Sequence, residues 1–442
     1  MRAAVEVLLL TLTACTSASA PEVEPTGSTP SSASSEPAPS EPAPSEPALP
    51  DPVLAVVGHA TEPQLELSRA AYRRIVDGDL DRWRGRDVVA GIRDVERRPG
   101  AIAVVPLDEV GPTVVAARVA GVDPVRDDPR AVELVVGGDL MLVRGVPSAA
   151  GALRPLARRL RSADLAVANL ESTLSRDGAP TQGGDSFGAT PALLGPIRRA
   201  GLDVLSLANN HAGDYGPRAL VETVDVLADS PVVPVGAGRD LAAASRPAYV
   251  ERGGVRFAFV AFNAIGETPR ATRTEPGALS VRMPPRTGPL VAADLRHVAA
   301  VVRRAARRAD VVVVLPHWGT QYTHEPEDIQ RVVGRRLVRA GADLVVGGHP
   351  HWVQGVDAVD GVPVLHSLGN LVFDMGPARF PVQAREGVLL EATFWGAELR
   401  AVRLAPYRMD PTTYAPRLLG GPDAAGVLAD VWGASTGPYA RR

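Results

Sequence analysis

Two histidines one residue apart, His349 and His351, stand in "GADLVVGGHPHWVQG" (residues 341–355), directly after an apolar run that ends in two glycines. On an extended segment, residues two apart point to the same side, and glycine lets another backbone approach closely. Two imidazoles on one side are an arrangement that a metal ion can use. A surface loop with two solvated histidines is the alternative, so the pair needs further ligands from elsewhere in the chain.

Four segments that share one design supply such ligands. Each begins with the Arg- and Ala-rich end of a helix, continues through an aspartate into a Val- and Leu-rich run, and ends in polar residues. The segments are residues 161–172, 199–211, 307–319 and 339–351. Continuous apolar runs after helices indicate strands that are buried on both faces, and therefore βα alternation in an α/β fold. Residues 131–141, 256–266 and 362–374 predict further strands of the same kind.

Ligands of open α/β sheets bind beyond the carboxyl ends of the strands, where this sequence places its polar clusters. These clusters are Asp139; Asn169 and Glu171; Asn209, Asn210 and His211; His317; His349 and His351; and Ser367, Asn370 and Asp374. Histidines, carboxylates and a carboxamide form an oxygen and nitrogen donor set that suits Mn²⁺, Fe or Zn²⁺. A single histidine or asparagine at a strand end is commonly structural or part of a turn. The recurrence at several strand ends favours a metal site.

Composition excludes several other kinds of site. The chain has 442 residues and a net charge of −3, which does not indicate a nucleic-acid-binding protein. All 47 basic residues are arginine, so a lysine Schiff base and the lysine of a phosphate-binding loop are excluded. The single cysteine, Cys15, excludes disulfides within the chain and cysteine-rich zinc sites.

The N-terminal residues 1–15 resemble a bacterial lipoprotein signal peptide. A short apolar stretch ends in "LTAC", where cleavage before Cys15 would free its thiol for acylation. We therefore expect lipidation at Cys15 and anchoring at the extracellular face of the cell membrane. An ordinary secretory signal with an incidental cysteine is the alternative. Residues 16–52, with the repeat "SEPAPSEPAPSEPALP", predict a Pro/Ser/Glu-rich linker without a core.

The folded part is expected to start with a small α/β module at residues 53–127. It contains a strand at "PVLAVVGHA", an amphipathic helix at "LSRAAYRRIVDGDLDRW" and a strand at "GAIAVVPLDEV", and it is similar to a piece of periplasmic phosphate-binding-type proteins. We interpret His59 in this module as structural. At the other end, residues 406–442 predict a closing strand-and-helix segment.

The order of the polar clusters resembles the CapA family of capsule or poly-γ-glutamate synthesis proteins. The matching motifs are "GGDLMLVRG" (137–145), "ANLESTLS" (168–175), "LANNHAGDYG" (207–216), "PHWGTQY" (316–322), "GGHPHWVQG" (347–355) and "HSLGNLVFD" (366–374), and the resemblance covers residues 131–405. It implies a fold like that of calcineurin-like metallophosphoesterases, with layered β-sheets flanked by helices.

The resemblance also implies roles for individual residues. Asp139 and His351 would bind a first divalent metal, Glu171 would bridge, and Asn210, His317 and His349 would bind a second. His211 would protonate the leaving oxygen, and Arg144 would contact a carboxylate or phosphate, unless it forms only a surface salt bridge. The catalytic candidates are His211, Asp139 and Arg144, and the expected substrate contacts are Asn169, Asn209, Asp214, Trp318 and Asn370.

Three departures from the phosphoesterase and CapA patterns affect this interpretation. Met141 replaces a metal-binding histidine, Glu171 replaces a bridging aspartate, and Gln321 replaces an acid of the CapA motif. Occupancy by one ion instead of two, and loss of phosphatase activity, both follow as alternatives.

Two functions therefore stay open. The first is an anchored metal-dependent hydrolase that acts on an anionic polymer or phosphoester in the cell envelope. The second is a non-catalytic accessory or binding subunit of an exopolymer synthesis complex. A solute-binding lipoprotein is disfavoured because residues 53–127 are too few for a two-lobed binder. A serine hydrolase that uses Ser367 is disfavoured because no nucleophile-elbow pattern surrounds it.

Overall fold

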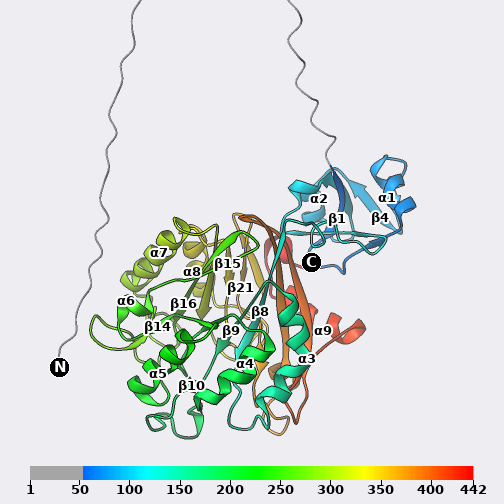
Figure 1. Cartoon of the computed structure of the whole chain (residues 1–442). Helices are drawn as coiled ribbons and strands as arrows, with labels where there is room; N and C mark the ends of the chain where they lie inside the picture. The colour runs from blue at the N-terminus through cyan, green and yellow to red at the C-terminus, as the bar shows by residue number, and fades with distance from the viewer. Residues whose placement is uncertain (1–52, 442) are drawn as a thin grey trace, which may run out of the picture. The chain divides into compact units, whose positions relative to one another are not determined.

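Two mixed β-sheets form the centre of the protein in the computed structural model, which describes residues 53–441 (Figure 1). The expected signal peptide with Cys15 and the linker at residues 16–52 lie outside the described residues. The first sheet has eight strands in the order β13-β12-β9-β8-β23-β24-β25, with β22 also paired to β8. Its strands are β8 (Ala131–Leu140), β9 (Leu165–Leu170), β12 (Val204–Ser206), β13 (Val233–Val235), β22 (Asn370–Val372), β23 (Glu386–Trp395), β24 (Glu398–Met409) and β25 (Pro416–Leu418).

The second sheet has six strands in the order β15-β16-β18-β19-β21-β20. They are β15 (Ala248–Arg252), β16 (Val255–Asn263), β18 (Val311–His317), β19 (Leu344–Val346), β20 (Val356–Val359) and β21 (Val362–Leu365). Strands β16, β18, β19 and β21 pair in parallel, as do β8, β9, β12 and β13 of the first sheet. The carboxyl ends of the parallel strands within each sheet therefore lie at one edge of that sheet.

A helix precedes each of four parallel strands, as the four-fold sequence design predicts. Helix α3 (Ala149–Ser162) precedes β9, α4 (Leu194–Ala200) precedes β12, α7 (Ala292–Ala306) precedes β18, and α8 (Asp328–Val338) precedes β19. Neighbouring parallel strands need such crossover connections, because a tight turn can join only antiparallel strands. Helix α5 (Gly216–Ala228) packs on the same face of the first sheet as α3 and α4.

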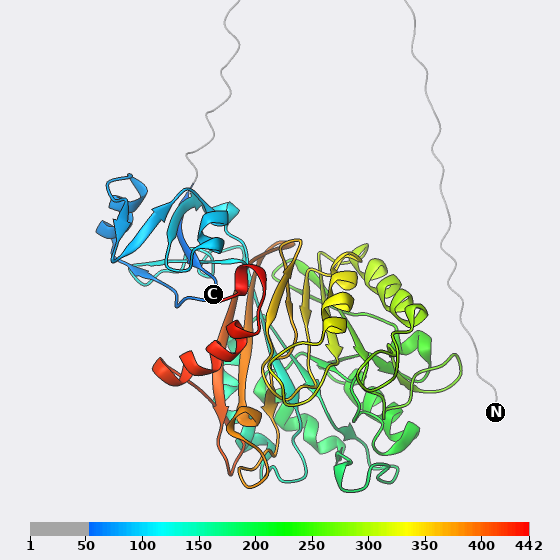
Figure 2. The same cartoon turned by 180° about the vertical axis from the view of Figure 1, so that it is seen from behind.

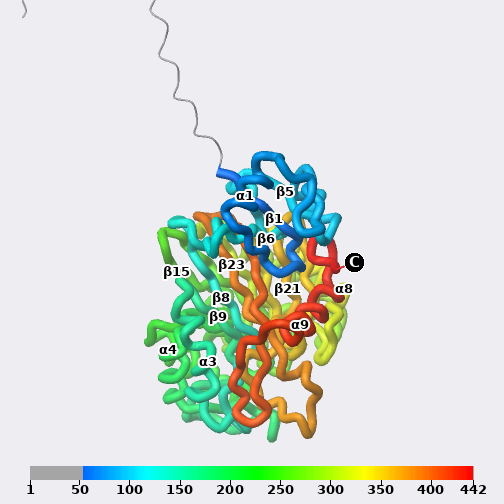
Figure 3. The backbone as a smooth tube through the Cα atoms, turned by 90° about the vertical axis from the view of Figure 1, so that its right-hand side faces the viewer, coloured from blue at the N-terminus to red at the C-terminus, as the bar shows by residue number. Residues whose placement is uncertain are grey.

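The apolar residues of the strands alternate between two cores. In β18, Val311 and Val313 pack between the two sheets, whereas Val312 and Val314 pack against α7 and α8. The outer face of the first sheet packs in the same way against α3, α4 and α5. Figures 2 and 3 show the resulting layers, with helices on both outer sides of the paired sheets. The predicted α/β fold of layered sheets flanked by helices is confirmed.

Residues 54–116 form a smaller sheet of their own, with the strand order β3-β4-β5-β1-β6 and the helices α1 (Arg69–Val76) and α2 (Ile92–Arg97). Its strands are β1 (Leu54–His59), β3 (Arg82–Trp83), β4 (Arg86–Val89), β5 (Ile102–Pro106) and β6 (Val114–Ala116). Helix α1 ends earlier than the sequence predicts, because Gly78 adopts a left-handed φ of 78° after Asp77. Trp395 Nε1 of β23 donates a hydrogen bond to the carbonyl of Val125 (3.0 Å) and so connects this part to the first sheet.

The C-terminal region adds two strands to the first sheet that the sequence did not predict. Strands β23 and β24 form a long antiparallel hairpin that lies in the first sheet next to β8. Strand β24 continues to Met409, beyond residue 405, where the family resemblance was expected to end. The sequence showed no helix before either strand, so the βα pattern that located the other strands was absent here. Helix α9 (Gly421–Gly433) follows, and its Val427, Val431 and Trp432 join the core between the sheets. Among residues 53–441, no helix is long and apolar enough to cross a bilayer.

A glycine at the end of β8 allows two backbones to meet. A Cβ atom on Gly138 would lie 1.8 Å from the carbonyl oxygen of Gly369, and the NH of Asp139 donates a hydrogen bond to the same oxygen (3.1 Å). The register of β8 against β9 also shifts between Val136 and Asp139. Such irregularities re-aim side chains next to functional sites. Gly138 therefore positions the Asp139 carboxylate.

We predict that Gly138→Ala lowers the free energy of unfolding by about 3 kcal/mol or more, because the clash is with backbone that cannot move aside. Denaturant unfolding measures this loss. The matched control is Gly426→Ala in α9, where the glycine is exposed and nothing lies within 4 Å of an added Cβ. That change should be neutral or stabilise the protein by about 0.5–1 kcal/mol. Equal stability of the two variants would contradict the proposed close approach.

Candidate metal centre

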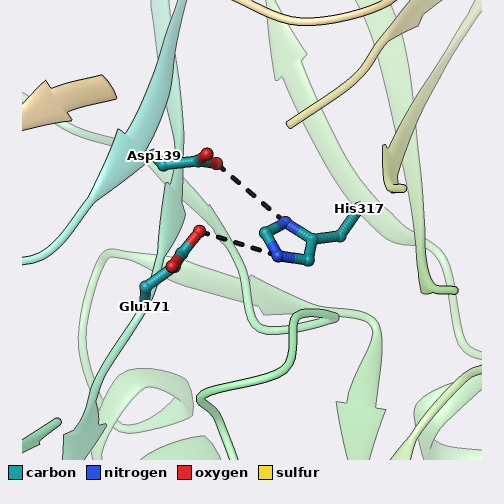
Figure 4. Close-up of side chains that lie close together, drawn as sticks. All are labelled: Asp139, Glu171 and His317. Carbon is teal, nitrogen blue, oxygen red and sulfur yellow. Dashed lines mark ion pairs between the residues drawn. The ribbon is translucent and has the colours of Figure 1, made fainter. Parts of the chain in front are cut away.

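The ends of strands from both sheets bring the expected ligands together. Asp139 is the second-last residue of β8 and Glu171 follows β9 in the first sheet, whereas His317 ends β18 in the second. Donor atoms of these three residues all lie within 4.8 Å of one another, and all three side chains are buried (Figure 4). His317 Nδ1 lies 4.0 Å from Asp139 Oδ1, and His317 Nε2 lies 3.7 Å from Glu171 Oε1. This group of side chains could hold a metal ion.

Two asparagines complete the inner part of the cluster. The Oδ1 atom of Asn210, which follows β12, lies 2.7 Å from His317 Nε2. The Nδ2 atom of Asn169 lies 2.8 Å from Asp139 Oδ1, 3.1 Å from Glu171 Oε1 and 3.1 Å from His317 Nδ1. The Oδ1 atom of Asn169 accepts a hydrogen bond from Asn209 Nδ2 (2.9 Å), which fixes the orientation of the Asn169 amide. Asn169 therefore touches the donor cluster itself.

His349 and His351 reach the cluster by a different geometry from the one the sequence suggested. Strand β19 ends at Val346, and both histidines have a positive φ, 96° and 60°, so the segment is not extended. The NH of His349 donates a hydrogen bond to Asp139 Oδ2 (2.9 Å). His351 Nδ1 lies 3.7 Å from the same oxygen. The two rings share one site because of this strained turn and not because of strand alternation.

His211 lies beside the cluster, held by Asp214. His211 Nδ1 lies 2.8 Å from Asp214 Oδ2, and Nδ1 is the donor because a carboxylate oxygen accepts. The other nitrogen, Nε2, lies 4.0 Å from Glu171 Oε2. The imidazole ring stacks on Phe187 at a centroid distance of 4.0 Å. This arrangement directs Nε2 toward the donor cluster.

Four of the five expected substrate contacts have side chains that are buried in contacts within the protein. Trp318 is fully buried against Phe262 and donates a hydrogen bond from Nε1 to the carbonyl of His366 (3.0 Å). Asn370 Oδ1 lies 2.8 Å from His351 Nδ1. Asn209 and Asp214 support Asn169 and His211 as described above. In this structure the four side chains contact other groups of the protein.

Arg144 forms ion pairs with two acids and also lines the pocket over the cluster. Its Nε atom donates to Asp374 Oδ2 (2.7 Å), and Nη1 lies 3.1 Å from Asp185 Oδ1. The guanidinium lies over the ring of Phe187, 4.7 Å from its centroid. The structure thus shows the salt bridge that the sequence left as the alternative to an anion contact.

The pocket over the cluster has a volume of about 390 Å³. Its lining includes His211, His349, Asn210, Gln321 and Tyr322, together with residues that the sequence analysis missed: Gln182, Phe187, Glu267, Arg286, Phe373, Met375, Arg379 and Phe380. Among the missed residues only Phe373 stands in a quoted motif, and the others lie in loops without strand or helix patterns. Of the nine non-glycine residues with positive φ in the described part of the chain, five line this pocket: Arg144, Glu267, Tyr322, His349 and His351. Strain of this kind concentrates at functional sites.

Comparison with known proteins agrees with this geometry. The family described as "Bacterial capsule synthesis protein PGA_cap" matches residues 133–375, more than half of the chain. The capsule biosynthesis protein CapA of Bacillus anthracis is 30% identical over 300 residues, which cover 64% of this chain and 71% of that protein. The chain belongs to the PGA_cap family. The predicted membership of the CapA family is confirmed.

Other relatives align over shorter stretches of this PGA_cap protein. The PGA biosynthesis protein CapA of Bacillus subtilis is 36% identical over 178 residues, 40% of this chain and 44% of that protein. A probable polyglutamine synthesis accessory protein of Mycobacterium tuberculosis is 33% identical over 219 residues, 48% of this chain and 56% of that protein. The chain thus spans less than two thirds of the length of these two relatives.

Charge in the centre of the PGA_cap protein is poorly compensated. Burial and the nearby Asp139 carboxylate raise the pKa of Glu171 well above its ordinary value. Burial, reinforced by neighbouring histidines, holds the pKa of His317 and His349 well below the ordinary value, so both rings are neutral at pH 7. Neutral imidazoles are in the protonation state that binds a metal ion. A divalent cation would also offset the repulsion between the carboxylates.

Two buried polar atoms in the cluster also lack a hydrogen-bond partner among the described residues, Glu171 Oε2 and His349 Nδ1. Leaving a buried polar atom unsatisfied costs on the order of 1–3 kcal/mol. Both atoms belong to residues expected to bind metal, and their oxygen and nitrogen chemistry suits Mn²⁺, Fe or Zn²⁺. The residues therefore fit a divalent ion.

We predict that, without metal, Glu171→Gln removes a pH-dependent loss of stability. With a raised folded-state pKa, Glu171 binds more protons in the folded than in the unfolded protein. The contribution of Glu171 to the free energy of unfolding therefore falls as the pH rises from about 4.5 toward the raised folded-state pKa. Glutamine does not titrate, so metal-free Glu171→Gln should lose less stability over this interval.

Thermal unfolding in EDTA across pH 4–8 measures the difference. With saturating Mn²⁺ the order should reverse, because the wild-type protein gains more from the ion. Glu275→Gln, which changes an exposed acid, is the matched control and should follow the wild-type curve. Parallel curves for wild type and Glu171→Gln would contradict the assigned burial of charge.

Proposed function

We propose that this PGA_cap protein acts in the synthesis or processing of a capsule or poly-γ-glutamate-type exopolymer through a metal-dependent, hydrolase-like site. The family match and the names of its relatives support the exopolymer context. One observation carries the chemistry: buried donor atoms from two sheets converge at one pocket, and two of them have no partner among the described residues. The substrate would be an anionic polymer or a phosphoester.

The residues that would hold one or two divalent ions are Asp139, Glu171, Asn210, His317, His349 and His351. A bound ion would polarise the scissile group and lower the pKa of a coordinated water. The Asn169 amide, held by Asn209, would keep the Asp139 and Glu171 carboxylates in place. Outer contacts of this kind usually change metal affinity about 10–100-fold when they are removed.

His211 would exchange the proton of the reaction. Its Nδ1–H is committed to Asp214, which fixes the tautomer and the ring orientation. The Nε2 atom is then free to transfer a proton to or from a leaving oxygen in the pocket. Stacking on Phe187 limits rotation of the ring. Asp139 would contribute as a metal ligand, and Arg144, being paired with Asp374, would shape the pocket wall.

A non-catalytic accessory role is the second candidate, and Met141 favours it. Its side chain is fully buried in the core on the helix-covered face of the first sheet and offers no ligand where phosphoesterases have a histidine. Gln321 lines the pocket where the CapA pattern has an acid. A site with these losses would bind an exopolymer or a partner without turnover.

His349→Ala distinguishes these candidates when metal content and turnover are measured together. We expect the purified wild-type protein to contain Mn, Fe or Zn by elemental analysis and to hydrolyse a generic phosphodiester when Mn²⁺ is added. His349→Ala should lose most of the metal and at least about 100-fold in rate, the scale of losing one preorganised catalytic group. His297→Ala, a histidine of α7 that lies outside the cluster and contacts Ser245, is the matched control.

Metal that is lost in His349→Ala, without turnover in the wild type, would favour the accessory role. No metal in the wild type under any condition would contradict the proposed centre.

Anchoring at the extracellular face of the membrane is a separate proposal that rests on Cys15 and its flanking residues. In a bacterial host that processes lipoproteins, the wild-type protein should enter the detergent phase on Triton X-114 partition, whereas Cys15→Ser should stay in the aqueous phase. The physical reason is that acyl chains contribute about 0.8 kcal/mol per buried CH₂ group to membrane binding. Equal partition of the two proteins would contradict lipidation.

A further inference from the structure

Tyr322 lines the pocket. Its backbone conformation is unfavourable, and packing in a core does not account for it. Its φ is 61°, which is unfavourable for a bulky aromatic residue, and its NH donates a hydrogen bond to the carbonyl of Pro350, between the two histidines (2.9 Å). The ring stacks near His351, with a centroid distance of 5.8 Å, yet the residue is 38% exposed. A strained backbone at a partly exposed aromatic residue indicates a role in ligand binding.

Tyr322 lines the pocket together with charged residues, among them Arg144, Asp185 and Arg379. Burial raises the pKa of Tyr322, so the phenol is protonated at pH 7 and can donate a hydrogen bond. The positive charges of Arg144 and Arg379 lower this pKa, and the negative charges of Glu171 and Asp185 raise it.

Arg379 differs from the other two arginines of the pocket. Arg144 pairs with Asp374 and Asp185, and Arg286 pairs with Glu267 (2.5 Å). No salt bridge among residues 53–441 includes Arg379, whose guanidinium lies 5.7 Å from the centroid of the Phe380 ring. Phe380 in turn lies 6.0 Å from the ring of Tyr322. A cation without a paired carboxylate and a phenol donor therefore stand on the same wall.

We propose that Tyr322 and Arg379 are substrate-binding residues that recognise an oxyanion, a phosphate or carboxylate group, of the substrate at this wall. The inference rests on the proposed function and deepens it, because it assigns recognition to two residues outside the donor cluster. The phenol donates one hydrogen bond, and the guanidinium offers a planar fork of donors that matches an oxyanion. The aromatic rings of Tyr322 and Phe380 hold both groups in place.

The test is calorimetric titration of inorganic phosphate into the full-length protein, with and without prior loading with Mn²⁺. Tyr322→Phe keeps the ring and removes only the hydroxyl, and it should weaken phosphate binding about tenfold, the range for a hydrogen bond to a charged group. Arg379→Gln should weaken binding about 2–5-fold at low salt and reduce its salt dependence, because an exposed cation is screened. Arg296→Gln on α7, another exposed arginine, is the control and should bind as the wild type does.

Melting temperatures and metal content should be unchanged in all three variants, which a merely structural role of Tyr322 would not allow. Wild-type affinity in both Tyr322→Phe and Arg379→Gln would overturn the inference while leaving the metal-dependent function intact. No phosphate binding by the wild-type protein at millimolar concentration, loaded or not, would also overturn it. Failure to bind metal, with phosphate binding still sensitive to the two substitutions, would overturn the proposed function and support the inference.

Discussion

The repulsion between two buried carboxylates, Asp139 and Glu171, is the constraint on which the rest of the site depends. Water cannot screen these groups because both are fully buried, and the three nearby imidazoles are neutral at pH 7. The Asn169 amide is one compensating donor, and it contacts both carboxylates. Keeping such a pair in the interior lowers the stability of the folded protein, and a bound divalent cation would restore that stability.

The two-sheet architecture explains how the pair is kept in place. Asp139 and Glu171 come from one sheet and His317 from the other, so the packing of one sheet on the other sets the distances in the donor cluster. Gly138 permits the close approach of the Gly369 carbonyl at the base of Asp139, and left-handed residues turn the His349 and His351 segment toward the same point. The packed core between the sheets therefore keeps the two carboxylates close together despite their mutual repulsion.

Much of this could be predicted from the sequence, because buried parallel strands leave a continuous apolar run and their polar ends meet at a sheet edge. Asp139, Glu171, His317 and His349 were found in that way. The hairpin of β23 and β24 was not, because no helix precedes its strands. The burial of Trp318 and Asn370 within the protein could not be predicted, because a motif does not show on which side of a backbone its side chains lie. Phe187 and Arg379 lie in loops, whose position depends on tertiary contacts that no local pattern encodes.

The most direct test of the account is a crystal structure of the protein soaked with Mn²⁺, with anomalous diffraction recorded at an energy above the manganese absorption edge. We expect an anomalous peak in the donor cluster, about 2.0–2.3 Å from carboxylate oxygen atoms of Asp139 or Glu171 and imidazole nitrogen atoms of His317 or His349. A structure with no peak between these side chains, or with manganese only at exposed acids, would contradict the assignment of this cluster as a metal centre.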